Sequence, residues 1–207
     1  MIQFTIVTPC YNAEQYIEET VRSIFAQKAL HTGRASLQYI VVDGKSSDRT
    51  VALVEECARD FAHGTLQIIS ERDGGMYEAL AKGLTLATGQ ICAYLNAGDL
   101  YSPHAFDIVI DVFEAHAVKW LTGFRTVYNE DGQIVFCQLP FPYRSRLFQV
   151  GLYDNRTLPH LQQESTFWNS ELHQFIDFDS LSGFKYAGDY YLWTCFSSHT
   201  ELKIAEA

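Results

Sequence analysis

Strand-like and helix-like segments alternate through about the first hundred residues, and this alternation restricts the possible folds more than any other feature of the sequence. Gln3–Thr8 and Leu37–Asp43 are short β-branched runs, and between them Ile17, Val21 and Ile24 recur at helical spacing. Strand, helix and strand in that order form a βαβ unit. We therefore predict an α/β fold whose mostly parallel central sheet is flanked by helices, with right-handed crossovers.

The same pattern continues as far as Leu95. Ser47 or Asp48 is placed to cap a second helix, and Leu66–Ser70 supplies a third strand. We expect another helix at Met76–Ala87 and a fourth strand at Gln90–Leu95.

The second half of the chain has a weaker pattern. After Pro103 we expect a helix as far as about Ala117, and then a hairpin. Its strands, Val118–Tyr128 and Gln133–Gln138, flank the turn at 129–132.

The segment 139–161 is rich in Pro, Tyr and Arg and is expected to be irregular, and a last helix is expected to open at AGDYYLW (187–193). No composition break marks a linker. We expect one domain over residues 1–207, with halves at about 1–102 and about 103–207.

Composition excludes several classes of partner. The formal charge of −10 argues against a nucleic-acid surface, because uncompensated carboxylates repel phosphates. No apolar stretch approaches the roughly 20 residues that span a bilayer, and Met1 leads directly into a strand, so we expect a cytoplasmic protein. The five scattered cysteines are interpreted as small buried hydrophobic residues.

Polar loops follow all four predicted strands, at Thr8–Asn12, Asp43–Ser47, Glu71–Gly75 and Asn96–Asp99. In parallel sheets ligands bind outside the carboxyl ends of the strands, so these loops should converge on one site. The G-x-G-x-x-G, P-loop and G-x-S-x-G patterns are absent, which disfavours dehydrogenases, P-loop enzymes and serine hydrolases. Acidic loops of this kind suit a divalent cation that holds a diphosphate.

Several motifs, in order over nearly the whole chain, carry a resemblance: FTIVTPCYNAEQYIEETVRSIFAQ, YIVVDGKSSDRT, SERDGGMYEALAKGLTLATG, YLNAGDLY, QQESTFW and AGDYYLW. Together they resemble the family 2 glycosyltransferases of the GT-A fold. The last two resemble the acceptor side of a bacterial subgroup that assembles surface polysaccharides.

The resemblance implies an enzyme that transfers a sugar, with inversion, from a nucleotide-diphosphate donor such as a UDP-sugar to a polysaccharide or lipid-linked glycan. Mn or Mg would be the cofactor. Members of the subgroup often continue further, so we expect a C-terminally truncated chain that acts in the cytoplasm, at the inner face of the membrane. The oligomeric state is left open.

The resemblance also assigns a donor pocket, consisting of Thr8, Pro9, Tyr11, Asn12, Asp43, Asp73 and Lys82. Asp43 would accept a hydrogen bond from a base N–H, Asp73 would lie near the ribose, and Lys82 would reach the diphosphate. Each has a structural alternative. Asp43 and Asp73 suit turns, Asn12 with Gln15 suits a helix cap, and Lys82 suits a solvated helix face.

Asp99 is the metal candidate. Hard cations often need only one or two carboxylates when a substrate phosphate completes the shell. The family supplies two or three acids at this position, whereas this chain has Asn96-Ala97-Gly98-Asp99, which also suits a simple turn.

Asp189 is the predicted general base for transfer, and Glu164 is the alternative base. Asp189 also suits a helix N-cap. Gln163 resembles a residue of the loop over the donor sugar, and Trp168 and Trp193 are hypothesised to stack on sugars, although core positions are the commoner role of such aromatics.

Tyr143, Arg144 and Arg146 are placed in the irregular segment, where a cation could meet a phosphate of donor or acceptor; a solvated surface is the alternative. A second hypothesis for the whole chain is a catalytically impaired nucleotide-sugar or glycan-binding module, suggested by the thinned metal motif. A nucleotidyltransferase is disfavoured because the first loop lacks a Gly- and basic-rich phosphate segment.

Overall fold

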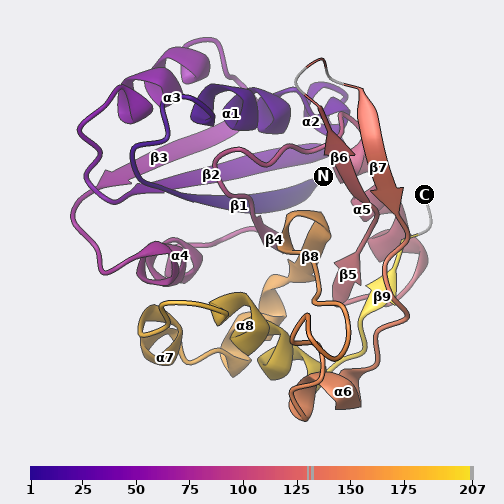
Figure 1. The fold of residues 1–207 in the computed structure, drawn as a ribbon. Coiled ribbons are helices and arrows are strands. Elements are labelled where there is room, and N and C mark those ends of the chain that lie inside the picture. Colours follow the sequence, from indigo (N-terminus) through magenta and orange to yellow (C-terminus); the bar gives the residue numbers. More distant parts are fainter. Residues whose placement is uncertain (130, 132, 206–207) are drawn as a thin grey trace.

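The computed structural model describes residues 1–129, 131 and 133–205. Its centre is a sheet of order β3-β2-β1-β4-β8-β5-β9, and a separate ribbon pairs β6 with β7 (Figure 1). The strands are β1 (Ile2–Cys10), β2 (Ala35–Asp43), β3 (Gly64–Ser70), β4 (Ile91–Tyr94), β5 (Trp120–Thr122), β6 (Arg125–Tyr128), β7 (Ile134–Gln138), β8 (Thr166–Asn169) and β9 (Lys203–Ile204).

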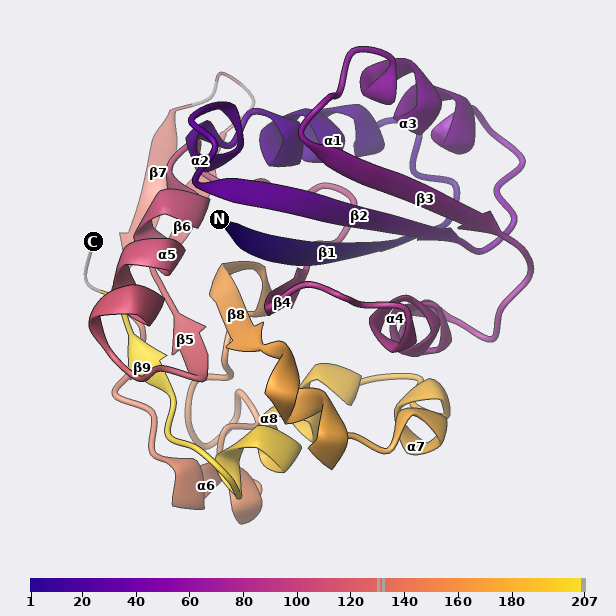
Figure 2. The ribbon, with the colours of Figure 1, turned by 180° about the vertical axis from the view of Figure 1, so that it is seen from behind.

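Helices cover both faces of the long strands. The α-helices are α1 (Ile17–Phe25), α2 (Lys28–His31), α3 (Thr50–Ala58), α4 (Met76–Thr85), α5 (Ala105–Ala115), α6 (Ser145–Gln149), α7 (Phe178–Ser182) and α8 (Gly188–Ser197), with 3₁₀ turns η1 (Gln163–Ser165) and η2 (Ser170–Phe175). Figures 1 and 2 show α1 and α3 on one face of β1–β3, with α4 on the other, followed by α7 and α8.

The predicted α/β architecture is confirmed. β1 pairs in parallel with both β2 and β4, and β2 pairs in parallel with β3. The spacing of Ile17, Val21 and Ile24 buries all three side chains of α1. Gly89 lies between α4 and β4 and packs closely against β1. Only glycine fits there, because a Cβ would lie 2.6 Å from the backbone nitrogen of Thr5.

The expected hairpin is wrong in its first strand. Val118–Tyr128 is not continuous, because Trp120–Thr122 is fully buried and joins the main sheet as β5. The chain then leaves the sheet at Gly123, whose N–H donates to the Ser165 carbonyl at 3.1 Å. Only β6 pairs with β7, and the predicted turn includes residues 130 and 132, which lie outside the described residues.

Other elements have no counterpart in the sequence predictions. β8 lies between β4 and β5 and runs antiparallel to both. The segment expected to be irregular contains α6, whose Phe148 is buried in the core. None of the described helices has the length and apolar character needed to cross a bilayer.

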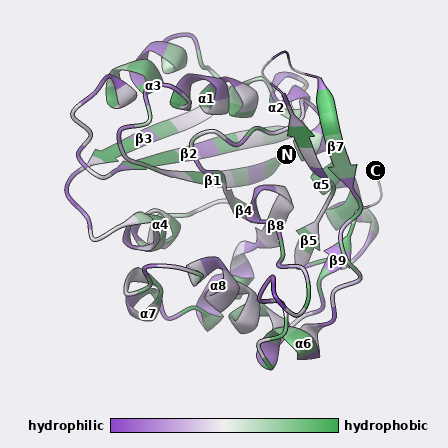
Figure 3. Cartoon of the chain, viewed as in Figure 1, coloured by the Kyte–Doolittle hydropathy of each residue, from purple (hydrophilic) through white to green (hydrophobic). Residues whose placement is uncertain are grey.

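The hairpin carries a run of exposed hydrophobic residues. Figure 3 shows β7 as one of the most hydrophobic segments, yet its side chains are exposed, including Ile134 and Val135. Cys137 in the same strand is exposed too, so the prediction of buried cysteines is wrong there. It is confirmed for Cys10 and Cys92, whose thiol pKa values burial raises to about 12.

Candidate active site

The carboxyl ends of the first three strands lie level with one another. Cys10 pairs with Asp43, and Asp43 pairs with Ser70, so the loops after β1, β2 and β3 start at the same edge. β4 ends at Tyr94 beside β1, which brings the loop containing Asp99 to that edge as well.

Asp43 organises the loop after β2. Its buried carboxylate accepts hydrogen bonds from the Ser46 backbone N–H at 3.0 Å, from the Ser46 hydroxyl, and from the Ser70 hydroxyl at 2.6 Å. The turn-forming interpretation is therefore confirmed. A hydrogen bond from a nucleotide base to Asp43 would require one of these serines to move.

Tyr11 and Asp73 flank the backbone of Gly44. A Cβ at Gly44 would lie 3.2 Å from Asp73 Oδ2 and 3.3 Å from Tyr11 Cδ2. The Tyr11 ring is 66% exposed. The exposed ring, at the edge of the sheet where ligands bind, offers a flat surface on which a nucleotide base could stack. The carboxylate beside it could accept a hydrogen bond from a ribose hydroxyl.

Asn12 does not cap the first helix, which corrects that alternative. Its φ is 47°, its N–H donates to Ser46 Oγ at 2.8 Å, and its Oδ1 accepts from the Ser47 N–H at 2.9 Å. α1 begins later, at Ile17, without a side-chain cap. Asn12 instead joins the loops after β1 and β2.

Thr8 and Pro9 are buried inside β1, because that strand continues to Cys10, beyond the predicted end. The Thr8 hydroxyl accepts from Tyr39 at 3.0 Å within the core. Both side chains belong to the core, so the predicted contact with the donor stays a prediction and would involve their backbone atoms.

Lys82 is engaged in an ion pair. Its Nζ lies 2.5 Å from Glu71 Oε1, and this partner raises the lysine pKa. The contact ties α4 to the loop after β3. A different cation, Lys185, reaches that loop from the segment between α7 and α8 and donates to the Gly74 carbonyl at 2.6 Å.

The loop after β4 holds Asp99 in a fixed position. Gly98 has φ 103°, a conformation that favours glycine, and its N–H donates to Thr20 Oγ1 at 2.9 Å. The same hydroxyl donates to the Asp99 carbonyl at 3.0 Å. Gln163 Nε2 donates to Asp99 Oδ2 at 2.9 Å, so two predicted site residues that are distant in sequence lie in contact.

Three acids gather above the end of β4. Burial raises the pKa of Glu164, and the negative charges of Asp99 and Asp189 raise it further. Burial also raises the pKa of the Tyr94 hydroxyl, with added contributions from the charges of these three acids. We call Asp99, Glu164 and Asp189 the acidic cluster.

Asp189 is oriented by Tyr77. The Tyr77 hydroxyl on α4 donates to Asp189 Oδ1 on α8 at 3.1 Å. Burial and the charge of Asp189 raise the Tyr77 pKa to about 12, so the phenol stays protonated and donates. The N-cap of α8 is Ala187, with φ 57°, so the N-cap alternative for Asp189 is wrong.

The oxygen donors around Asp99 fit a hard divalent cation. Among the described residues, Asn96 Oδ1 and Gln163 Oε1 are buried and have no hydrogen-bond partner. Burial of unpartnered oxygens is costly, and a cation would satisfy them. No group of three or more His, Cys, Asp or Glu side chains suited to a metal occurs within the described ranges, so a cation would need a ligand's phosphates to complete its shell.

Two hypotheses about aromatic platforms are not supported. Trp168 is completely buried and donates to His173 Nε2 at 3.0 Å, and Trp193 stacks on Trp120 in the core. Neither indole presents a face to a sugar. Arg144 and Arg146 are exposed, in line with the solvated-surface alternative.

Comparison with known sequences gives matches over most of the chain. The family model described as Glycosyl transferase family 2 matches residues 5–167. An uncharacterized glycosyltransferase of Mycobacterium tuberculosis is 28% identical over 170 residues, which cover 81% of this chain and 59% of that relative. The minor teichoic acid biosynthesis protein GgaB of Bacillus subtilis is 29% identical over 113 residues, 55% of this chain and 12% of GgaB.

Solved structures share the fold. Residues 1–349 of Staphylococcus aureus TarS superpose with a TM-score of 0.73 at 18% identity, covering 99% of this chain and 58% of that one, and TarS has also been solved with UDP-GlcNAc. A Pyrobaculum calidifontis mannosyltransferase in complex with GDP-Man and Mn²⁺ gives 0.56 at 23% identity, covering 83% and 45%. This chain thus spans about three fifths of the length of the mycobacterial relative and of the TarS fragment.

Proposed function

The chain belongs to glycosyl transferase family 2, and on that premise we propose that it transfers a sugar, with inversion, from a nucleoside diphosphate donor to a glycan acceptor. The observation that carries the proposal is a pair of contacts at the carboxyl edge of the sheet: Gln163 bonds to Asp99, and Tyr77, on the helix that follows Asp73, bonds to Asp189. This arrangement supports neighbouring sites for the donor and for the proposed general base.

The donor is proposed to be a UDP-sugar, because TarS, which shares the fold, binds UDP-GlcNAc. The Tyr11 ring would contact the base, and Asp73 would accept a hydrogen bond from the ribose. Asp43 would act through the turn that it holds. Lys82 would meet the diphosphate only after leaving Glu71.

Asp99, with the amide oxygens of Asn96 and Gln163, would hold Mn²⁺ or Mg²⁺. Such a cation supplies charge stabilisation of the departing diphosphate. Gly98 and Ala97 shape the loop that places these oxygens, and Gly98 does so through its left-handed backbone.

Asp189 is proposed as the general base. Its Oδ1 is occupied by Tyr77, which leaves Oδ2 without a donor among the described residues. Oδ2 would take the proton of the acceptor hydroxyl while that oxygen bonds to the anomeric carbon from the opposite face. The bond from the anomeric carbon to the diphosphate oxygen breaks, and its electron pair leaves with the diphosphate. Glu164 is the alternative base.

The acceptor is proposed to be a surface polysaccharide or a lipid-linked precursor of one. Support comes from the name of GgaB, a relative in teichoic acid biosynthesis. A lipid-linked acceptor would bring the protein to the cytoplasmic face of a membrane.

A donor screen tests the proposal by measuring released nucleoside diphosphate with Mn²⁺ present. We expect turnover of at least one UDP-sugar, and we expect Asp189→Ala to lower it roughly 10²- to 10⁴-fold. Asp99→Ala should also abolish metal-dependent turnover, whereas Asp60→Ala, which removes an exposed acid beyond α3, should change nothing.

A fully active Asp189→Ala enzyme would remove that residue from the mechanism and leave Glu164 as the base. The single carboxylate at the metal position favours one other function, a nucleotide-sugar-binding module without turnover. Tight donor binding with no released diphosphate at any metal concentration would establish that alternative.

A further inference from the structure

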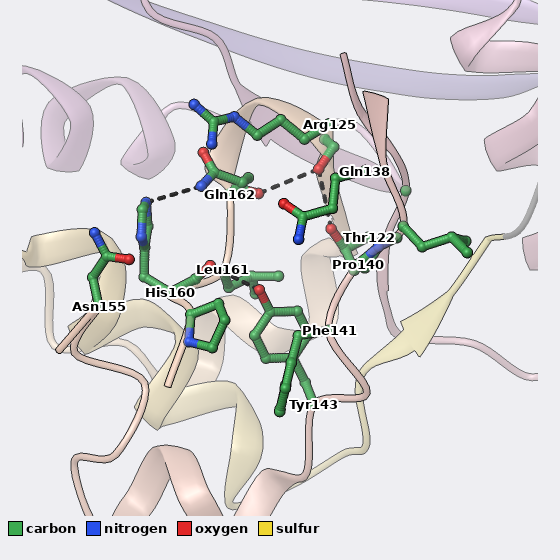
Figure 4. A pocket seen from close by; sticks show the side chains of 14 residues that line it. Thr122, Arg125, Gln138, Pro140, Phe141, Tyr143, Asn155, His160, Leu161 and Gln162 are labelled. Atoms are coloured by element: carbon green, nitrogen blue, oxygen red, sulfur yellow. Dashed lines mark hydrogen bonds between the residues drawn. The ribbon is translucent and has the colours of Figure 1, made fainter. Parts of the chain in front are cut away.

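A cavity of about 400 Å³ lies beside the acidic cluster but is not part of it. It is enclosed by the strands β6 and β7, the segment after β7, and the loop that leads into η1. Figure 4 shows side chains from all of these segments around it, including Arg125, Gln138, Phe141, Asn155, His160 and Gln162.

The lining is basic and rich in amides, although the chain carries a formal charge of −10. None of the residues that line the cavity is an Asp or Glu, and Arg125 contributes a guanidinium. Its nearest acid is Glu164, with 4.0 Å between Arg125 Nε and Glu164 Oε1, and the arginine side chain is 45% exposed. A pair this long leaves most of the guanidinium N–H groups free for a ligand.

Neutral polar groups complete the lining. Gln162 Nε2 lies 3.1 Å from His160 Nε2, and the amides of Gln138 and Asn155 face the same space (Figure 4). Phe141 adds an apolar surface. Amides that bind hydroxyl groups, an aromatic surface and one cation suit a saccharide or polyol that bears a negative charge.

The cavity shares a thin wall with the acidic cluster. Gln162 and Ser165 line the cavity, while of the two residues between them Gln163 bonds to Asp99 and Glu164 is a member of the acidic cluster. A polymeric or lipid-linked acceptor could therefore occupy the cavity with one unit and present the hydroxyl of the next unit to the base.

We propose that this cavity is an acceptor subsite that binds a phosphate or carboxylate group on a sugar or polyol unit, with Arg125 as the anion-binding residue. The inference rests on the proposed function, since the acceptor role follows from the wall shared with the acidic cluster. The donor loops after β1 and β2 do not line the cavity, which separates this subsite from the nucleotide.

The test uses three probes that differ only at one carbon: glucose 6-phosphate, glucuronate and glucose. Each is titrated into the full chain while NMR follows the Arg125 Nε and His160 ring signals. We expect saturable shifts with at least one anion, and binding of glucose weaker by roughly tenfold or more, the difference that one charge-assisted hydrogen bond makes. A response to only one anion would identify phosphate or carboxylate as the group recognised.

Arg125→Gln should reduce anion binding to the level of glucose, and Arg59→Gln, the same charge change on an exposed residue after α3, should have no effect. Unchanged binding of UDP with Mn²⁺ to Arg125→Gln would show that the variant is folded. The inference is overturned if no anion shifts Arg125, if glucose binds as tightly, or if Arg125→Gln binds anions normally. Absence of UDP binding to the wild type would instead count against the proposed function, because the anion titration does not use the donor site.

Discussion

The carboxyl group of Asp99 is held in a place that is unfavourable for its charge. Burial raises its pKa, and the single hydrogen bond from Gln163 only partly offsets this. The neighbouring Asn96 oxygen is buried without a partner among the described residues. Buried charges and buried polar atoms without a hydrogen-bond partner concentrate at functional sites, where a bound ligand can pair with them.

We predict that Asp99→Asn is more stable than the wild type at pH 7. A carboxyl whose folded pKa lies above its ordinary value of 3.8 stabilises the fold most at low pH, and that contribution is lost as the pH rises through the folded pKa. The amide avoids the loss because it carries no charge. The melting temperature of the variant should exceed that of the wild type at pH 7, and the difference should shrink as the pH falls toward 4.

The matched control is Asp60→Asn, which should melt like the wild type at both pH values because Asp60 is exposed. If Asp99→Asn melts below the wild type at pH 7, the charged carboxylate stabilises the fold, which would contradict the prediction.

The motifs located several site residues from sequence alone. Asp99 and Gln163 meet although 64 positions separate them, because the polar residues were placed at strand ends and in a recognisable acceptor-side cluster. Arg125 and Tyr77 were missed. Arg125 lies in the part of the hairpin whose pairing was predicted correctly, but no motif marks it, and Tyr77 belongs to a motif whose partner, Asp189, is distant in sequence.

At the scale of elements, α4 and α8 meet through one tyrosine. The Tyr77 ring packs on the start of α8, where a Cβ on Gly188 would lie 2.5 Å from Tyr77 Cδ1. Only a residue without a side chain fits there. The close approach brings the Tyr77 hydroxyl to Asp189 and links the helix after the donor loop to the proposed base.

Tyr77→Phe is therefore predicted to impair Asp189 without abolishing donor binding. Without this hydrogen bond the Asp189 carboxylate is free to rotate away from the acceptor hydroxyl, so the effect should fall on kcat. We expect kcat to fall about tenfold, the effect of a hydrogen bond worth roughly 1.4 kcal/mol, with little change in the donor KM.

Tyr191→Phe serves as the control. The Tyr191 hydroxyl lies on α8, as Asp189 does, but it bonds to the Asp177 carbonyl. A kcat for Tyr77→Phe equal to that of the wild type would mean that the tyrosine only fills space.

The elements predicted well are those that their own local sequence pattern specifies. β1 and β2 have long buried runs, and α1 between them has clear helical spacing. β8 and β9 have four and two residues, and they become strands only because distant segments pair with them. The split of the expected hairpin has the same origin, since the apolar run at β5 suits a hairpin as well as a central strand.

For the whole molecule, the order of the strands in the sheet determines which polar side chains come together in the candidate site. β8 adds to the parallel strands beside β4, and the 3₁₀ turn that precedes it brings Gln163 and Glu164 to the loop containing Asp99. α8 then adds Asp189 through its contact with α4. The acidic cluster is thus assembled from three separate parts of the chain.

The exposed apolar residues of β7 and the cavity beside them belong to the segment 122–165, which follows the four polar loops of the first hundred residues. That the first half of the chain binds the donor and the second receives the acceptor stays a prediction. The sequence could not locate the cavity, because its lining comes from segments between Thr122 and Ser165 that share no motif.

The most direct test of this account is a crystal structure of the protein with UDP and Mn²⁺, with the metal located by its anomalous scattering. We predict one Mn²⁺ bound by the Asp99 carboxylate and the diphosphate. The uracil ring should lie against Tyr11, and Asp189 should lie at the β-phosphate end of the nucleotide. A nucleotide bound elsewhere, or a metal that makes no contact with Asp99, would contradict it.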